Sequence, residues 1–594
     1  MTTHHSRFIR HAFLALAVAS IIGVAGCGQD SAPKQAAMPA AAPAAAPTGP
    51  APAQTADTIF TGGDIVTVND AQPTAEAVAV KDGKILAVGA RADVEKNHKG
   101  AATKVVDLAG RTLTPGFIDG HAHVAQFGTQ AIGANLLAAP DGHVETIDDL
   151  IAEMKKAVET QDASLTGWVF GMGYDDAILG RHPTRDDLDK VSTTVPVTVI
   201  HISGHFSAVN SVGLKKIGYT AATKDPAGGV IRRRPGSKEP NGVMEETAHF
   251  AYAVEAVAPK TPAASDLFMK KALELAKSFG YTTANEGMTF PPQHAGFVDA
   301  AERGLLDIDV IGYVPYANRD ILDSYGVSTT YKGHYRLGGM KVVLDGSPQG
   351  RTAWRTIPYK LVPDGQKPDY RAYPAIPDTK ILNALFDEAY QKKWPTHVHA
   401  NGDAAIDQMI TALRPVHAKY GPGDRRTALI HGQFIRQDQL DALKELQVIP
   451  SLFPMHTFYW GDWYDKIIGP ELAAQISPMR SAIDRGMRPT SHTDAPVALP
   501  NLMQVMWATV NRVTRSGKVQ GPAERISPTE ALKAITLWSA YEQFEENTKG
   551  SIEVGKVADL VILDKNPITV DPMTINKIVV LETIKDGKTV YARK

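Results

Sequence analysis

The sequence predicts an α/β protein whose main domain is a (β/α)8 TIM barrel. Between about residues 260 and 500, short apolar runs alternate with helical stretches such as 264–279, 380–392 and 437–446. Together with an earlier run, the apolar runs number eight, and an alternating series of this length indicates a closed parallel sheet. The eight runs are 117–123, 281–285, 308–313, 340–345, 396–399, 428–431, 448–452 and 487–491.

Residues able to bind a metal stand at the ends of several of these runs. In TIM barrels the chemistry takes place at the C-terminal ends of the strands, so this coincidence indicates an active site. Alternation along a strand places His121 and His123 on one face, and it does the same for His397 and His399. Either of the latter pair could ligate, and we favour His399 because it is nearer the strand's end. The six candidates are His121, His123, Lys341, His399, His431 and Asp494.

The two ends of the chain predict a second, smaller domain. Short apolar segments separated by turn signals such as Asp82-Gly83 occur in residues 57–114, and similar segments follow residue 557. We expect a small β-sandwich formed from 57–114 and 500–594, the latter including the last barrel helices. The barrel then occupies 115–499, with a long insertion at 124–260 that follows the first barrel strand and caps the site.

The N-terminus has the pattern of a secretory signal peptide. Arg7 and Arg10 precede an apolar run at 13–24 that is too short to span a bilayer. Val24-Ala25-Gly26-Cys27 resembles a bacterial lipobox, which implies cleavage after residue 26 and lipidation of Cys27. We therefore expect an exported protein, anchored by lipid to a bacterial membrane on the periplasmic or outer-membrane side. The alternative is a plain secreted protein with a chance cysteine.

Composition narrows the remaining possibilities. Residues 27–56 are rich in Ala and Pro, which predicts an extended tether. Cys27 is the single cysteine of the 594 residues, so an internal disulfide and thiolate metal ligands are both excluded. A formal charge of −2 gives no electrostatic reason to expect nucleic acid as a partner. The oligomeric state is not predicted.

Several motifs together resemble the amidohydrolase superfamily, and in detail its amidohydrolase-3 branch, which includes N-substituted formamide deformylase. The resemblance covers the chain from about residue 57 to the end. The motifs are 115–123, 338–341 with 345–347, 399–403, His431, 493–497 and 555–560.

This resemblance implies a role for each candidate ligand. His121 and His123 would bind a first metal ion, and His399 and His431 a second. Lys341 would be carboxylated and bridge the two ions, while Asp494 would bind the first ion and act as general base. Two Zn²⁺ ions are expected, although another divalent metal is possible; imidazoles and carboxylates without sulfur suit Zn²⁺. The rival is a single-metal site in which Lys341 pairs with Asp345.

Four further residues are candidates for substrate contacts. His205 lies in the insertion, and the resemblance assigns it to substrate binding or to contact with the transition state. An aromatic cluster after the seventh run contains His456, Phe458 and Trp460. On a loop at the catalytic face these side chains could line an apolar or aromatic pocket. The alternative, equally supported, is that they pack the lid against the barrel.

Taken together, the sequence predicts a metal-dependent hydrolase acting on a small molecule. It would cleave an amide-like C–N bond, of the N-acyl or N-formyl type, with metal-activated water and Asp494 as general base. Deamination of a heterocycle on the same scaffold is the competing enzymatic interpretation. A catalytically idle, exported interaction protein is the alternative outside enzymes.

The lipobox interpretation predicts the behaviour of a Cys27→Ser variant. Without the thiol that carries the lipid, the variant should be soluble or unprocessed, whereas the parent chain should partition into the detergent phase. Phase separation in Triton X-114 of both proteins, expressed with their full N-termini, measures this. Identical partitioning of the two would contradict the prediction.

Overall fold

The computed structural model describes residues 54–226, 229–363 and 366–594. The predicted signal peptide, Cys27 and nearly all of the predicted tether lie outside these residues. Within the described ranges, none of the helices combines the length and the apolar character needed to cross a bilayer.

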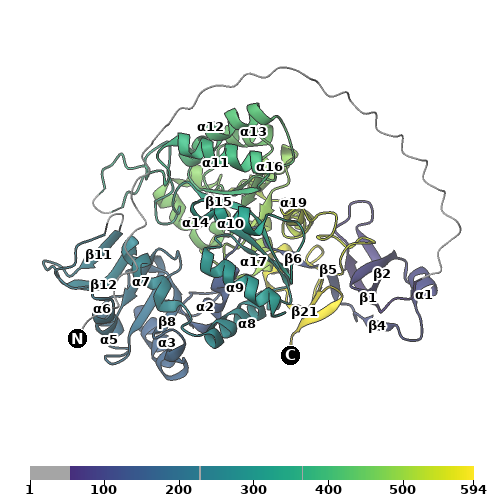
Figure 1. The fold of residues 1–594 in the computed structure, drawn as a ribbon, viewed down its shortest axis with the longest axis horizontal. Coiled ribbons are helices and arrows are strands. Elements are labelled where there is room, and N and C mark those ends of the chain that lie inside the picture. Colours follow the sequence, from purple (N-terminus) through teal and green to yellow (C-terminus); the bar gives the residue numbers. More distant parts are fainter. Residues whose placement is uncertain (1–53, 227–228, 364–365) are drawn as a thin grey trace, which may run out of the picture. The chain divides into compact units, whose positions relative to one another are not determined.

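Eight parallel strands form the central sheet, as the sequence predicts for a TIM-barrel-type fold (Figure 1). In sheet order they are β6 (Phe117–Ile118), β13 (Tyr281–Glu286), β14 (Asp309–Pro315), β15 (Tyr335–Val343), β16 (Thr396–Ala400), β17 (Ala428–His431), β18 (Ile449–Leu452) and β19 (Thr490–Ser491). The first and last strands are only two residues long. Beyond their ends, the Asp494 N–H donates to the His121 carbonyl at 3.0 Å and the His123 N–H donates to the Ala495 carbonyl at 2.9 Å. These two bonds bring the outer strands of the sheet together.

Helices follow most of the barrel strands and bury an apolar face on them. The α8 helix begins after Thr261, whose side chain accepts from the Ala264 N–H, and Pro262 occupies its first turn, where its missing N–H does no harm. Val342, Val398 and Leu429 lie fully buried between the strands and this helical layer. The helices are α8 (Pro262–Ser278), α9 (Pro291–Glu302), α10 (Asp320–Tyr325), α11 (Thr379–Lys392), α12 (Asp403–Tyr420), α13 (Gln437–Glu445), α14 (Met455–Ile467), α16 (Met479–Asp484), α17 (Leu502–Asn511), α18 (Pro528–Ala534) and α19 (Leu537–Glu542).

Strands from both ends of the chain share a second sheet, also of eight strands. The order is β22-β21-β20-β5-β1-β2-β3, with β4 paired to β1, and the antiparallel β5–β20 pair joins the two chain ends. Figure 1 shows the purple N-terminal strands beside the yellow β21. The strand pairing gives one continuous sheet. The expectation that this domain is a β-sandwich stays a prediction. The strands are β1 (Thr58–Val66), β2 (Thr74–Lys81), β3 (Lys84–Gly89), β4 (Lys104–Asp107), β5 (Thr112–Pro115), β20 (Leu560–Leu563), β21 (Val580–Lys585) and β22 (Lys588–Ala592).

The insertion after the first barrel strand contains a third sheet with its own apolar clusters. Its strands are β7 (Ala134–Asn135), β8 (Val169–Tyr174), β9 (Val197–His201), β10 (Phe206–Val209), β11 (Gly229–Arg233) and β12 (Pro240–Glu246). The preceding helix, α2 (Val124–Ile132), differs from expectation, because Val124 and Phe127 are buried in the barrel core. A Cβ on Gly128 would lie 2.2 Å from the Phe268 carbonyl oxygen, so α2 packs closely on α8. The separate sheet therefore starts about ten residues later than the predicted insertion.

A buried ionic cluster connects the small sheet to the barrel. The Lys585 Nζ lies 3.0 Å from Asp559 Oδ2 and 2.9 Å from Asp309 Oδ2 on β14, and Lys549 also bonds Asp309. Each of these four side chains is at most 5% exposed. Since a buried charge is tolerated when it is paired, the cluster fixes the two sheets against each other.

Removing one member of this cluster should destabilise the fold. Lys585→Met leaves Asp559 buried beside fewer positive charges, and breaking such a pair typically lowers the free energy of unfolding by about 3–5 kcal/mol. Urea denaturation followed by circular dichroism measures the change, with Lys588→Met on the exposed side of β22 as the matched control. Equal midpoints for Lys585→Met and the parent chain would show that the cluster contributes nothing.

Candidate metal centre

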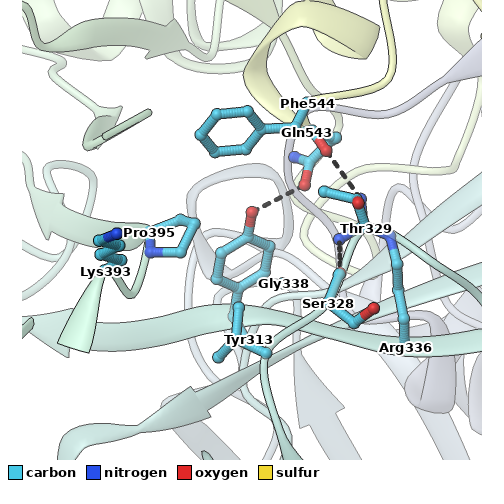
Figure 2. A pocket seen from close by; sticks show the side chains of 10 residues that line it. Tyr313, Ser328, Thr329, Arg336, Gly338, Lys393, Pro395, Gln543 and Phe544 are labelled. Carbon is cyan, nitrogen blue, oxygen red and sulfur yellow. Dashed lines mark hydrogen bonds between the residues drawn. The ribbon is translucent and has the colours of Figure 1, made fainter. Parts of the chain in front are cut away.

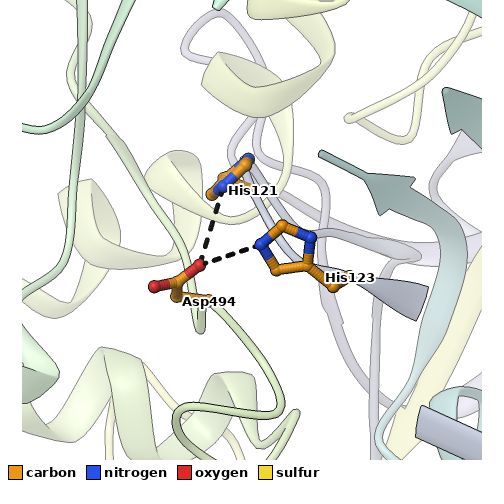
Figure 3. Close-up of side chains that lie close together, drawn as sticks. All are labelled: His121, His123 and Asp494. Carbon is orange, nitrogen blue, oxygen red and sulfur yellow. Dashed lines mark ion pairs between the residues drawn. The ribbon is translucent and has the colours of Figure 1, made fainter. Parts of the chain in front are cut away.

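The structure brings His121, His123 and Asp494 together at the closing edge of the barrel (Figure 3). The Asp494 Oδ1 atom lies 3.6 Å from His121 Nε2 and 3.5 Å from His123 Nε2. Bonds of about 2.0–2.1 Å in a tetrahedral zinc site place its ligand atoms about 3.4 Å apart. The three side chains therefore have the spacing of ligands around one small divalent ion.

The charges around these residues favour a cation. Burial lowers the pKa of His123, but its contacts with Asp494 and Glu286 outweigh burial and raise that pKa to about 9. Burial and the nearby Lys341 hold the pKa of His121 well below its usual value, so its ring is neutral, as a metal ligand must be. Burial alone would raise the pKa of Asp494, yet the bond from His123 keeps it lowered and the carboxylate ionised. The donor set thus fits a divalent metal ion.

The side chain of Lys341, on β15, points toward His121. Its side chain is 2% exposed, and its Nζ is 3.0 Å from His121 Nε2. Burial lowers the pKa of Lys341 to about 7, against the opposing effect of Asp494, Glu542 and Glu286. An appreciable fraction of the amine is therefore neutral at physiological pH.

His399 and His431 complete the ring of candidate ligands. Their ring centroids are 4.6 Å apart, and the centroid of His431 is 5.4 Å from that of His121. The His431 Nδ1 lies 3.9 Å from Asp494 Oδ2. The six candidate ligands from the sequence therefore lie close together, linked by these contacts at the same end of the barrel.

The geometry distinguishes His399 from His397. His399 Nε2 is 3.5 Å from Asp345 Oδ1 and shares the mouth of the site with His431. His397 is fully buried deeper in the barrel, where it stacks on Tyr313 at 3.5 Å and lies 3.2 Å from Glu542 Oε1. His399 therefore lies beside the candidate ligand His431, whereas His397 contacts Tyr313 and Glu542.

Asp345 is occupied by partners other than Lys341. It accepts the backbone N–H groups of Trp354, Asn401 and Gly402 at 2.9, 2.9 and 2.7 Å. The Asp345 carboxylate therefore organises the segment that follows β16. Among the described residues it does not pair with Lys341, as the single-metal alternative would require.

The histidines of the first strand do not lie on a strand, contrary to expectation. β6 ends at Ile118, and the Asp119 carboxylate shapes the turn that follows, accepting the His121 N–H at 3.2 Å. The ring of His121 then packs on Gly287, where a Cβ would lie only 2.0 Å from its Cε1 atom. A glycine is required there because any side chain would displace the ring.

Two candidate ligands have left-handed backbone. His431 has φ of 75° and Asp494 has φ of 50°, a region that residues other than glycine seldom adopt. Such conformations persist where the surroundings enforce them, and they are concentrated at functional sites. Here they turn both side chains toward His121.

Sequence reasoning missed Glu286 and His492. Glu286 ends β13, is 2% exposed, and lies with Oε1 3.5 Å from His123 Nδ1. The sequence does contain a signal for Glu286, because it is an acidic residue directly after a predicted barrel strand. His492 Nε2 lies 3.0 Å from His431 Nδ1, a contact across the barrel that no local pattern indicates.

The remaining predicted site residues are His205 in the insertion and the aromatic cluster that follows the seventh barrel strand. His205 occupies the turn between β9 and β10, with its ring 5.5 Å from that of Phe250 in α7 (Thr247–Val257). The aromatic cluster forms α14 rather than the expected loop, because His456, Trp460 and Tyr464 recur every four residues and pack together. His456 and Trp460 are each 3% exposed, which favours packing, whereas Phe458 is half-buried. Substrate contact by these residues stays a prediction.

A cavity of about 410 Å³ lies elsewhere, lined by residues such as Val327, Lys393 and Pro395 that precede barrel strands β15 and β16 (Figure 2). Because catalysis in this fold takes place at the opposite, C-terminal ends of the strands, we do not assign the cavity to the active site.

Known proteins are similar to this chain over almost their full length. The chain is similar to the putative amidohydrolase YtcJ of Bacillus subtilis (strain 168), with 25% identity over 547 residues covering 90% of this chain and 99% of the relative. It is also similar to N-substituted formamide deformylase of Arthrobacter pascens, with 26% identity over 564 residues covering 91% and 99%.

Solved structures share the fold. An uncharacterized metal-dependent hydrolase from Pyrococcus horikoshii OT3 superimposes with a TM-score of 0.69 at 22% identity, covering 87% of this chain and 99% of that one. The model of the amidohydrolase family matches residues 104–591, which include the barrel, the insertion and most of the small sheet. The chain therefore belongs to the amidohydrolase family.

Proposed function

We propose that this amidohydrolase is a metal-dependent enzyme that cleaves an amide-like C–N bond in a small N-acyl or N-formyl compound. The observation that carries the proposal is the approach of two imidazole Nε2 atoms to one Asp494 oxygen, at 3.6 and 3.5 Å, beside a buried lysine. His121, His123 and Asp494 would hold one divalent ion, and His399 and His431 a second. Zn²⁺ is the proposed metal. When bound, it would polarise the scissile carbonyl and make a water molecule more acidic.

Asp494 is the proposed general base. Its carboxylate is ionised and 15% exposed, so it can both reach the substrate and accept a proton. It would take the proton of the attacking water and deliver it to the departing nitrogen, which leaves as the amine. The hydrogen bond from the Asp494 N–H to His121 fixes the carboxylate's position relative to the histidine pair.

Lys341 is proposed to carry a carbamate that bridges the two ions. Its neutral amine can attack CO₂, which forms an N–C bond and releases one proton to solvent. The product carries a charge of −1 and two oxygen ligands, where an ammonium group would repel the metal ions. Burial, which lowers the pKa of the amine, supports this chemistry.

The names of the relatives support the reaction class. One relative is called an N-substituted formamide deformylase, and its similarity spans almost its full length. At 26% identity the substrate itself does not carry over, so we extend only the N-acyl or N-formyl class to this chain. The half-buried Phe458 and His205 remain proposed substrate contacts.

A direct assay tests the function. The purified chain, dialysed against chelator and then loaded with Zn²⁺, is incubated with a panel of N-formyl and N-acyl amines. We expect release of the acid and the amine together, in the loaded protein only. Release of ammonia from a heterocycle without an acid would instead identify a deaminase, and no turnover with either class would favour the interaction protein.

Asp494→Asn should lower turnover strongly. The substitution keeps the size of the side chain but removes the proton acceptor and one anionic ligand, so we expect a loss of at least about 100-fold in kcat. Steady-state kinetics on the metal-loaded variant measures it, with the exposed Asp441→Asn as control. Turnover near the parent value in the loaded Asp494→Asn variant would assign the base elsewhere, with His205 the next candidate.

Lys341→Ala should lose metal and activity together. Without a bridging carbamate the two ions repel each other, so we expect fewer than two Zn²⁺ per chain by plasma mass spectrometry. Acetate, a small carboxylate, should restore part of both the metal content and the rate. The exposed Lys444→Ala is the control. If Lys341→Ala keeps its metal and its rate, the two-metal proposal is wrong.

A further inference from the structure

Outside the metal centre, the insertion brings together a serine, a histidine and an aspartate. They lie at the C-terminal ends of β8 and β9, two parallel strands that pair Tyr174 with His201. Ser203 follows β9 in the turn that leads to β10, and Asp176 begins the short helix α4 (Asp176–Leu179) after β8. Ser203 Oγ is 2.8 Å from His201 Nδ1, and His201 Nε2 is 2.9 Å from Asp176 Oδ1. The imidazole therefore connects the hydroxyl to the carboxylate.

The backbone fixes the tautomer of the His201 ring. The Ser203 N–H donates to His201 Nδ1 at 3.1 Å, so this nitrogen carries a lone pair and no proton. A neutral ring then has its proton on Nε2, which donates to Asp176. Because Nδ1 can only accept, its contact with Ser203 Oγ requires the hydroxyl to donate. The hydroxyl proton therefore points at a base, which is the arrangement that activates a serine nucleophile.

The carboxylate of Asp176 can stabilise the positive charge that His201 gains when it takes this proton. Burial alone would raise the pKa of Asp176, but the hydrogen bond from His201 holds that pKa below its usual value, so the carboxylate stays ionised. Asp175, Asp176 and His201 also have the spacing of metal ligands. A metal ion would need the lone pair of His201 Nε2, whereas the contacts of the ring place its proton there. The hydrogen bonds thus favour proton transfer over metal binding.

The turn that contains Ser203 is open on one side. Gly204 is exposed and has a left-handed φ of 69°, and a Cβ added there would meet no atom of the described residues within 4 Å. Ser203 itself is 7% exposed and is the neighbour of this open position. The His205 N–H lies 3.3 Å from Ser203 Oγ, close to where negative charge develops on a carbonyl that the hydroxyl attacks. A small carbonyl compound can therefore approach Ser203 from the side of Gly204.

We propose that Ser203, His201 and Asp176 form a second catalytic site, which hydrolyses small esters without a metal ion. Ser203 Oγ bonds to the ester carbonyl carbon while His201 Nδ1 takes the hydroxyl proton. The bond from that carbon to the alcohol oxygen then breaks, and the alcohol leaves with the proton. Water, deprotonated in its turn by His201, attacks the acyl carbon, releases the acid and returns the proton to Ser203. This activity is independent of the proposed amide hydrolysis.

Two probes test the site in the purified full chain, with and without a chelator. p-Nitrophenyl acetate reports ester hydrolysis by the release of p-nitrophenol. A small alkyl fluorophosphonate forms a P–O bond with an activated serine as fluoride leaves, and mass spectrometry of tryptic peptides locates the label. We expect the label on Ser203 and steady release of p-nitrophenol, both unchanged by the chelator.

Variants of the three residues separate catalysis from packing. Ser203→Ala should abolish both the label and the chelator-resistant hydrolysis. Asp176→Asn keeps an acceptor for His201 Nε2–H but removes the charge, so the rate should fall by at least about tenfold. Ser211→Ala is the matched control, since Ser211 is an exposed serine that donates to Asp189 at 2.6 Å, and it should leave both readouts unchanged. Circular dichroism melting checks that each variant folds like the parent.

The outcomes are distinct. A label absent from Ser203, or a parent-like rate in a folded Asp176→Asn variant, would show that these hydrogen bonds only close the turn and would overturn the inference. Ester hydrolysis that stops with the chelator and persists in Ser203→Ala would belong to the metal centre, and it would overturn the inference as well. A labelled Ser203 with chelator-resistant ester hydrolysis, in a chain that cleaves no amide, would support the second site while the proposed function fails.

Discussion

The carboxylate of Asp119 is the point on which the geometry of this barrel depends. It accepts the His121 N–H at 3.2 Å, the Thr493 N–H at 3.1 Å, the Thr493 hydroxyl at 2.6 Å and the Tyr281 hydroxyl at 2.6 Å. One buried side chain thus holds together the segments that follow β6 and β19 and the first residue of β13, where the outer strands themselves are only two residues long. Burial raises the pKa of Asp119 to about 6, against the bonds that stabilise its charge. Its partners, rather than solvent, determine its position.

Around the Asp119 carboxylate, the barrel has an apolar outer layer and a polar interior. The strands present residues such as Val342 and Leu429 to the helices, and this burial supplies most of the driving force for folding. The other face of the strands presents imidazoles, hydroxyls and carboxylates. Burying these polar groups costs free energy unless each of them has a hydrogen-bond or ion-pair partner. The hydrogen bonds of Ser451 and Thr490, and the ion pairs of His123, meet that need. The interior thus gathers the histidines that would bind the proposed cation, with partners that hold them in place.

The sequence predicts what is local and misses what crosses the barrel. The eight barrel strands follow from apolar runs bounded by helical stretches, and strands such as 428–431 match to the residue. The ligand candidates follow from their places at strand ends. The first barrel strand, by contrast, is shorter than predicted, because β6 ends at Ile118 and the Asp119 carboxylate shapes the turn that follows. The sequence predicts a loop where the helix α14 forms. Its buried aromatic residues recur at every fourth position and do not make a continuous apolar run. The His431–His492 contact joins residues 61 positions apart, and no pattern in either segment reports it.

The central claim is that six residues from five segments of the barrel, His121, His123, Lys341, His399, His431 and Asp494, form one two-metal centre. Diffraction from crystals of the Zn²⁺-loaded chain, collected above and below the zinc absorption edge, tests it most directly. The account predicts two anomalous peaks, one among His121, His123 and Asp494 and one between His399 and His431, with carbamate density on the Nζ of Lys341 linking them. A single peak, or zinc bound only outside this ring of side chains, would contradict it.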